Sequence, residues 1–280
     1  LIIAPTLAMK ANKEHSFGIS PLIGYQRFKA EGLQGFSAYS SDQTKLTNNG
    51  YDSATGFGVR FGWMGKITDS LTLGAAYSTK IRMKKFDKYA GLFAEQGDFD
   101  IPENWNIGLA FKPAQKWTVA LDYQRINYGG IRSVGNPSTN NGDSTAASFF
   151  INISLGCNSC RGFGWSNVDV VKLGLEYQYN DQWTLRAGYN HSKNPIQSRD
   201  VTFNILAPGV VQDHVTLGAT YNLDKQSEIT VSYMHAYEKS VTGTSLFQNW
   251  TPGFGLGTGG TETIKMYQNS LGIAYGRKFQ

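Results

Sequence analysis

Basic side chains occupy the polar positions of segments in which apolar and polar residues alternate. They are Arg60, Lys80, Arg82, Lys84, Lys172 and Arg186. The acids Asp122, Glu176 and Glu228 occupy positions of the same kind. Such positions share one face of a strand, so the cations could bind an anionic ligand inside a hollow sheet. The alternative is that cations and acids pair with each other across the interior and hold it rigid.

Two cysteines, Cys157 and Cys160, stand close together in the motif GCNSCRG at residues 156–162. A thioredoxin-type redox site needs this spacing at a helix start in a βαβ unit, and the surrounding sequence provides neither. A zinc site needs two further ligands, and the histidines are dispersed along the chain. The motif therefore indicates a small loop disulfide or a pair of free thiols.

Motifs for catalysis and for nucleic-acid binding are not found. There is no Gly-x-Ser-x-Gly, no phosphate-binding loop and no carboxylate pair in a recognisable context. The net charge is +5 with a pI near 9.0, but the basic residues are spread over the chain without a reader motif. We predict a protein that is not an enzyme, has no cofactor or metal and binds no nucleic acid.

The elements that must position these residues are strands. In residues 171–179 (VKLGLEYQY) the odd positions are aliphatic or aromatic and the even positions are Lys, Gly, Glu and Gln. A period of two gives a strand with one apolar and one polar face. We predict about eleven such strands, near residues 1–11, 15–31, 53–67, 71–84, 99–112, 117–130, 167–180, 183–194, 211–223, 227–241 and 263–279.

The connections between these strands alternate in length. Short turns fall at residues 12–14, 68–70, 113–116, 181–182 and 224–226, and long loops fall near residues 32–52, 85–98, 133–166, 195–210 and 243–262. Short turns on one rim and long loops on the other are typical of an outer-membrane β-barrel, whose apolar face meets lipid. The fold class predicted is thus all-β: an antiparallel transmembrane barrel with short periplasmic turns and long extracellular loops carrying short helices.

Three similar phrases support a membrane barrel. LTLGAAY (71–77), WTVALDY (117–123) and WTLRAGY (183–189) each place apolar anchors six residues apart, which is about 20 Å on a strand. That separation suits the two interfaces of a bilayer. A soluble β-sandwich with aromatic core ends is the alternative, but it would leave an unusually glycine-rich face in water. In the oxidising compartment of an outer-membrane protein, a Cys157–Cys160 disulfide is the expected state.

The chain is expected to be one domain over residues 1–280 that lacks its N-terminal part. Residue 1 is Leu, and the first residues read directly into a strand instead of a signal peptide. A bacterial barrel of this type has an even number of strands, so an odd count also suggests that the first strands are absent.

Several phrases resemble the long-chain fatty-acid transporter (FadL) family, which includes aromatic-hydrocarbon uptake proteins. They are IAPT (3–6), GYQRFKAEGL (24–33), FDKYAGLFAEQG (86–97), DIP (100–102), NILAPG (204–209), DH (213–214) and VSYMH (231–235). The resemblance implies a parent barrel of about fourteen strands, of which the N-terminal hatch and the first strands would be missing here. It also implies passive uptake of hydrophobic compounds across the bacterial outer membrane, with long-chain fatty acids or aromatic hydrocarbons as the expected substrates. A general porin or a structural barrel is the alternative.

The resemblance suggests two binding regions. An external apolar groove would use two loops, with Leu33, Phe36 and Tyr39 in one and Phe86, Tyr89, Leu92 and Phe93 in the other. The second set recurs at helical spacing, and the alternative is that it only packs a helix onto the rim. A fatty-acid carboxylate would bind in the lumen at Arg60, Arg82, Lys172 or Arg186. The expected partners are hydrophobic small molecules together with outer-membrane lipid and lipopolysaccharide.

Overall fold

The structure is a computed structural model that describes residues 1–140, 154–246 and 260–278. The strands are β1 (Ile2–Ile3), β2 (Leu7–Lys10), β3 (His15–Phe28), β4 (Asp52–Lys66), β5 (Leu71–Ser78), β6 (Arg82–Met83), β7 (Asn104–Ala114), β8 (Trp117–Ile126), β9 (Val168–Gln178), β10 (Trp183–Ser192), β11 (Asp213–Asn222), β12 (Ser227–Thr244) and β13 (Thr261–Arg277). The 3-10 helices are η1 (Gln34–Tyr39), η2 (Gln43–Lys45), η3 (Asp87–Tyr89), η4 (Tyr128–Gly130) and η5 (Ser198–Asp200), and the α-helices are α1 (Ala94–Gly97), α2 (Arg132–Gly135) and α3 (Val201–Asn204).

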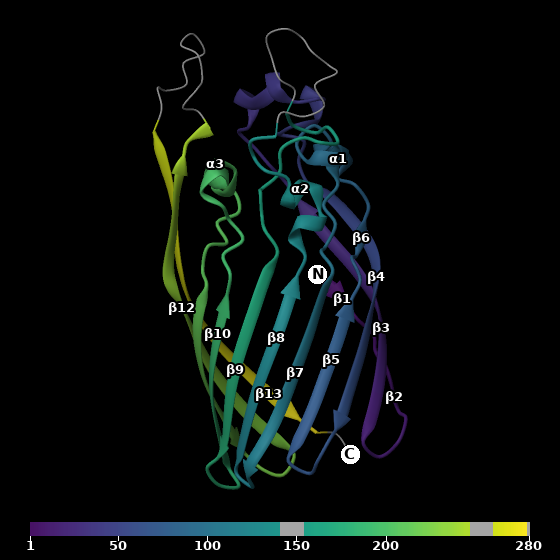
Figure 1. Cartoon of the computed structure of the whole chain (residues 1–280), viewed down its shortest axis with the longest axis vertical. Helices are drawn as coiled ribbons and strands as arrows, with labels where there is room; N and C mark the ends of the chain where they lie inside the picture. The colour runs from purple at the N-terminus through teal and green to yellow at the C-terminus, as the bar shows by residue number, and fades with distance from the viewer. Residues whose placement is uncertain (141–153, 247–259, 279–280) are drawn as a thin grey trace.

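All described strands belong to one 13-stranded sheet, in which each strand pairs antiparallel with its neighbour in the order β1-β3-β4-β5-β7-β8-β9-β10-β11-β12-β13. β2 pairs with β3, and β6 pairs with β4. The sheet curves without closing, with short turns at one end and α1, α2 and α3 at the other (Figure 1). This confirms the predicted antiparallel sheet and the alternation of short turns with long, helix-bearing loops. The predicted strand end at residue 279 and parts of loops 133–166 and 243–262 lie outside the described residues.

The short turns are closed by side-chain oxygens. The Asn12 Oδ1 accepts hydrogen bonds from two backbone amides of its turn at 2.9 and 2.7 Å. The Asn180 Oδ1 does the same at 2.9 and 2.8 Å, and the Asp224 Oδ1 at 2.7 and 2.7 Å. An Asn or Asp side chain that mimics a backbone turn in this way reverses the chain in few residues. The same local chemistry therefore recurs at the rim of the short turns.

Two predicted strands are interrupted. The first breaks around Pro5, which has no N–H to donate to a ladder, so that β1 and β2 pair separately with β3. The other breaks after Ser78. Arg60 of β4 lies opposite Ser78, whereas Phe57 of β4 lies opposite Arg82. The chain from Ser78 to Arg82 therefore contains one residue more than the stretch of β4 from Phe57 to Arg60 that it faces. Such a bulge reverses the alternation of faces beyond it.

The two faces of the sheet differ in chemistry. One face carries large apolar side chains that are exposed, such as Phe57 (58%), Leu121 (42%) and Leu217 (57%). The opposite face carries small and polar residues, and at the loop end its Leu22 and Ala54 are each 1% exposed. They are covered by the long loops, so this face is the interior of the curved sheet. Among the described residues no helix is long and apolar enough to cross a membrane.

Candidate functional site

The loop of residues 85–98 packs onto the inner wall of the sheet. Its Phe86, Tyr89 and Phe93 are 2%, 0% and 7% exposed. They form a core, here called the rim core, with the wall residues Leu22, Ala54, Ile81 and Met83, and Phe28 packs against it. The Phe28 ring lies 4.9 Å from the rings of both Tyr89 and Phe93. The apolar stripe predicted at helical spacing is built on a single 3-10 turn, η3, followed by α1.

Tyr89 also ties two loops together through its hydroxyl group. The Tyr89 hydroxyl donates to the Gly50 carbonyl at 2.6 Å and accepts from the Ala30 amide at 3.1 Å. Ala30 lies just before the loop of residues 32–52, and Gly50 lies near the end of that loop. A fully buried hydroxyl with two partners contributes to stability, because leaving either partner unpaired in the interior is costly. Tyr89 therefore holds the two loops in a fixed relation.

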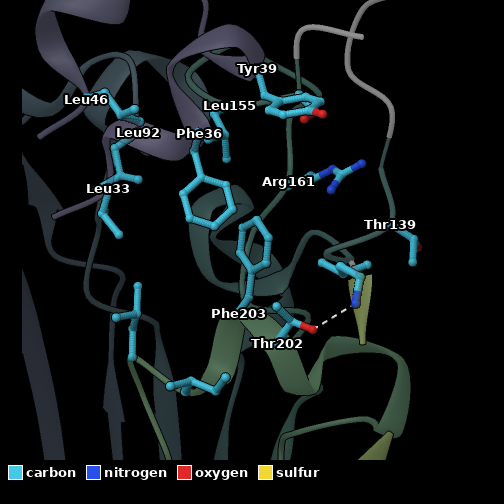
Figure 2. A pocket seen from close by; sticks show the side chains of 14 residues that line it. Leu33, Phe36, Tyr39, Leu46, Leu92, Thr139, Leu155, Arg161, Thr202 and Phe203 are labelled. Atoms are coloured by element: carbon cyan, nitrogen blue, oxygen red, sulfur yellow. Dashed lines mark hydrogen bonds between the residues drawn. The ribbon is translucent and has the colours of Figure 1, made fainter. Parts of the chain in front are cut away.

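An apolar cavity of about 520 Å³ opens between these loops. Four residues of the predicted groove line it: Leu33, Phe36, Tyr39 and Leu92. The other lining residues come mostly from loops farther along the chain and are Leu46, Thr139, Ser154, Leu155, Arg161, Thr202, Phe203, Ile205, Leu206 and Leu246. Figure 2 shows the rings of Phe36 and Phe203 facing each other across the hollow. The volume falls within the range of roughly 300–1,000 Å³ that is usual for small-molecule sites.

The predicted groove is thus divided between two environments. Phe86, Tyr89 and Phe93 belong to the rim core, whereas Leu92, from the same loop, faces the cavity. Burial of the three aromatic rings against the wall fits the alternative of simple packing. The orientation of the remaining four residues leaves them accessible to a ligand.

Arg161 is the one charged residue that lines the cavity among the described residues. Its Nε donates to the Asn140 carbonyl at 3.1 Å, and its backbone amide donates to the Ser154 carbonyl at 2.8 Å. It lies at the side of the hollow between Tyr39 and Thr139 (Figure 2). Burial lowers the pKa of the Arg161 guanidinium, but an arginine remains a cation in proteins. A half-buried cation at the edge of an apolar cavity suits a ligand with an anionic head group and an apolar tail.

The cysteine motif lies directly beside this cavity. Cys157 and Cys160 are joined by a disulfide, and Leu155 and Arg161 on either side of it both line the hollow. The disulfide loop docks on α1, which is a left-handed turn with φ of 59° at Glu95. There the Glu95 amide donates to the Cys157 carbonyl at 3.1 Å. The disulfide loop therefore positions part of the cavity wall.

Three of the predicted lumen cations lie on the inner face, each bound to a neighbour. Arg186 lies opposite Glu176 in the register and pairs with its carboxylate at 2.8 Å. Lys172 donates to the Gln124 side chain at 3.0 Å, and Arg60 donates to the Ser78 hydroxyl at 2.8 Å. Arg186 thus pairs with an inward acid, as the alternative expected, but the pair joins two adjacent strands and does not cross the interior.

The prediction that Arg82 and Lys84 face the lumen is wrong. Arg82 lies opposite Phe57 on the apolar, outward face, and Lys84, two residues on, is exposed on the same side. Met83 between them is buried in the rim core. The bulge after Ser78 causes this reversal, because the polar–apolar alternation of β5 does not continue in register into β6.

Several cavity residues carried no role in the sequence prediction. Arg161 lies inside the motif GCNSCRG, directly after Cys160, and Phe203, Ile205 and Leu206 form an apolar group inside a segment expected to be a long loop. An apolar run within a polar connection is a signal that could have identified them. Their meeting with Phe36 depends on contacts across the molecule.

The antiparallel sheet, with its exposed apolar outer face and its polar inner face, defines the fold class of an outer-membrane β-barrel. The family profile described as "Outer membrane protein transport protein (OMPP1/FadL/TodX)" matches residues 1–275. The chain therefore belongs to this family of outer-membrane transport proteins.

Curated relatives are similar at low identity. The long-chain fatty acid transport protein of Escherichia coli K12 is 21% identical over 275 residues, which cover 81% of this chain and 58% of the relative. That of Salmonella typhi is 23% identical over 138 residues, covering 49% of this chain and 28% of the relative. The chain thus spans less than two thirds of the curated relatives that it matches.

Solved structures share the fold. The Pseudomonas putida toluene transporter TodX aligns with a TM-score of 0.61 at 17% identity, covering 97% of this chain and 67% of that one. A Pseudomonas aeruginosa FadL homologue aligns with a TM-score of 0.62 at 18% identity, covering 98% and 67%. These similarities extend over nearly the whole chain and support the barrel architecture.

Proposed function

We propose that this chain forms the wall and outer mouth of a channel for the passive uptake of long-chain fatty acids. Hydrophobic compounds cross the lipopolysaccharide layer poorly, so a protein that imports them needs an apolar capture site outside the membrane. The cavity between the long loops suits this role, because apolar side chains from loops distant in sequence converge there. Burying an alkyl chain against them gains about 0.8 kcal/mol per CH₂ group.

The observation that carries the choice of a fatty acid is the position of Arg161. It is the one charged lining residue among those described, and its Nε is already held by the Asn140 carbonyl. The remaining guanidinium donors suit a carboxylate, to which arginine binds with two parallel hydrogen bonds. A monoaromatic hydrocarbon would use the rings of Phe36 and Phe203 without needing the cation, and it is the second candidate.

The test compares palmitate, hexadecanol and toluene as ligands of the purified protein in detergent. We expect palmitate to bind more tightly than hexadecanol, and Arg161→Gln to weaken palmitate binding roughly 10- to 100-fold, as loss of a charge-assisted hydrogen bond would. Binding of hexadecanol should change little. Arg161→Lys, which keeps the charge, should retain part of the affinity.

The double variant Lys172→Gln/Arg186→Gln is the matched control, since it removes two cations from the inner wall below the cavity. Loss of palmitate binding in this variant, with no effect of Arg161→Gln, would move the carboxylate site into the lumen. Toluene binding that exceeds palmitate binding and ignores every substitution would replace the fatty acid with an aromatic hydrocarbon.

A further inference from the structure

A cluster of basic side chains lies on the outward face of the sheet near the loop end. It consists of Arg27 on β3 and of Arg82 and Lys84 at β6, and we call it the basic rim patch. All three are exposed. The inward direction at these strands is marked by Leu22 and Met83, which are buried at 1% and 7%. Residues an odd number of positions away along the strand point the opposite way, toward lipid. Arg82 and Lys84 are each one position from Met83, and Arg27 is five positions from Leu22.

The register brings the patch together. Tyr25 lies opposite Thr55, and the Lys84 amide donates to the Thr55 carbonyl at 2.8 Å. Lys84 therefore stands two strands from Tyr25, and Arg27 stands two residues beyond Tyr25 on the same face. From a strand spacing of about 4.8 Å and a rise of about 3.3 Å per residue, the Cα atoms of Lys84 and Arg27 are roughly 12 Å apart. Arg82 is about 7 Å from Lys84 by the same geometry.

Arg27 is held in place by an aromatic ring. Its guanidinium carbon lies 3.6 Å from the centroid of the Tyr51 ring, and the Lys29 Nζ lies 5.5 Å from the same centroid. Tyr51 is itself 55% exposed. A cation stacked on an aromatic face loses little freedom when it binds an anion. The patch is therefore partly organised before any ligand arrives.

The charges of the patch are not neutralised by acids. Among the described residues, Arg27, Arg82 and Lys84 have no ion pair with a carboxylate, and the nearby Glu31 is engaged by Lys29 at 2.7 Å. At other places on the outward rim, basic side chains are paired with acids.

Farther along the sheet, three outward cations are paired with acids. Arg125 and Lys193 share the Asp169 carboxylate, each at 2.9 Å, and Lys265 pairs with Glu238 at 2.9 Å. Acids on this rim also accept from outward tyrosines. An unbalanced positive field is therefore concentrated at β3, β4 and β6 in the described part of the sheet.

The patch lies at the depth of the outer-leaflet head groups. Phe17, near the short-turn end of β3, faces outward at 51% exposure. Ten residues separate it from Arg27, about 33 Å along the strand and roughly 25 Å along the membrane normal at the tilt of a barrel strand. That height equals the apolar band of such barrels. Arg82 is level with Ile23 in the register, four residues from Arg27 or about 13 Å along the strand. Its long aliphatic stem can extend its charged head toward the interface.

We propose that the basic rim patch binds the phosphate groups of lipopolysaccharide in the outer leaflet. Lipopolysaccharide carries phosphates on an acylated sugar, so the acyl chains would lie along Ile23 and Phe57 while Arg27, Arg82 and Lys84 contact the phosphates. Unpaired cations at an interface attract such anions, and each Lys or Arg close to the surface strengthens the attraction. The bound lipid would anchor the wall beside the loop that forms the rim core.

The test uses fluorescently labelled diphosphoryl lipid A, with anisotropy of the purified protein in a neutral detergent as the readout. The variant is Arg27→Gln/Arg82→Gln/Lys84→Gln. The control is Lys13→Gln/Lys116→Gln/Lys225→Gln, which removes the same charge at the short turns. We expect the patch variant to lose affinity roughly 100-fold, because three surface cations each contribute about a factor of five, and the control to stay within about twofold.

Two further measurements on the unmodified protein keep the proposal independent of the folding of the variant. Dephosphorylated lipid A should bind at least 10-fold more weakly, and added salt should weaken the binding of the phosphorylated form. Equal binding of the two lipids, or an equal loss in the control variant, would overturn the proposal. Phosphatidylglycerol binding as tightly as lipid A would overturn it too, since the patch would then be a surface for any anionic lipid.

Discussion

At the scale of single residues, neighbours in one loop have opposite roles. Phe93 is buried against Phe28, with ring centroids 4.9 Å apart, while Leu92 beside it lines the cavity. Phe86 is buried in the rim core, and its backbone amide donates to the Gly97 carbonyl at 2.8 Å. The same apolar character therefore serves packing at one position and ligand contact at the next.

This division predicts different effects for two aromatic substitutions. Phe86→Ser should destabilise the loop by about 3–5 kcal/mol, the usual cost of emptying a buried aromatic site, and should lower capture only because the loop loosens. Phe36→Ser should leave the loop stable and weaken binding of palmitate directly. Hydrogen exchange of residues 86–97, measured beside palmitate affinity, distinguishes the two. A loop that exchanges equally fast in both variants would contradict the assignment.

At the scale of elements, irregularities place the functional groups. The bulge after Ser78 turns Arg82 outward and Met83 inward. At Gly56, opposite Met83, an added Cβ would lie 2.5 Å from the backbone carbonyl oxygen of Arg82, so the close approach of β4 and β6 favours glycine at this position. The left-handed turn α1 presents its amides to the disulfide loop. Each feature departs from regular structure where two segments meet.

The segment after α1 should respond to pH. Burial, followed by the charge of Asp100, raises the pKa of Asp98 to about 6 despite the opposing effect of Lys80; Glu95 raises it and Lys85 lowers it to a smaller extent. The folded form thus binds a proton between about pH 4 and 6 that the unfolded form has released, so stability falls as pH rises through this window. Asp98→Asn should remove the dependence and add on the order of 1–2 kcal/mol at pH 7.5, allowing for partial exposure to solvent.

Protection factors from hydrogen exchange of residues 94–101, compared at pH 5 and pH 7.5, measure this effect. The unmodified protein should be better protected at pH 5, and Asp98→Asn should be equally protected at both. Asp181→Asn, at an exposed short turn on the other rim, is the control. Loss of the pH dependence in the control, or its persistence in Asp98→Asn, would count against the burial of Asp98 as the cause.

At the scale of the whole molecule, the outward face decides the environment in which the chain folds. Its exposed apolar side chains run the height of the sheet, from Trp183 at a short turn to Tyr189 higher on the same strand. A contiguous apolar surface of this size is not stable in water. The polar inner face, with pairs such as Arg186–Glu176, can face water within the curved sheet.

The protein should therefore refold from denaturant into detergent micelles and aggregate when detergent is absent. Circular dichroism for strand content and a heat-dependent shift in gel mobility would report folding. Leu121→Asp and Leu173→Asp together, on the outward face, should reduce the folded yield, whereas Lys172→Ala on the inner face should not. A monomeric, folded protein in buffer alone would instead favour the soluble sandwich.

The alternation in residues such as 171–179 by itself determined the strands and the antiparallel sheet, because a period of two is a local property that survives in any register. The family was indicated separately, by phrases such as residues 86–97 that resemble it. Local chemistry also placed short turns, and Asn12, Asn180 and Asp224 each close one of these reversals. Only the tertiary structure decided that Phe86 packs while Leu92 lines the cavity, that Arg161 joins that cavity, and that Arg82 faces lipid. The first two depend on contacts between distant loops, and the third on one extra residue at a bulge, which no periodicity within a strand reveals.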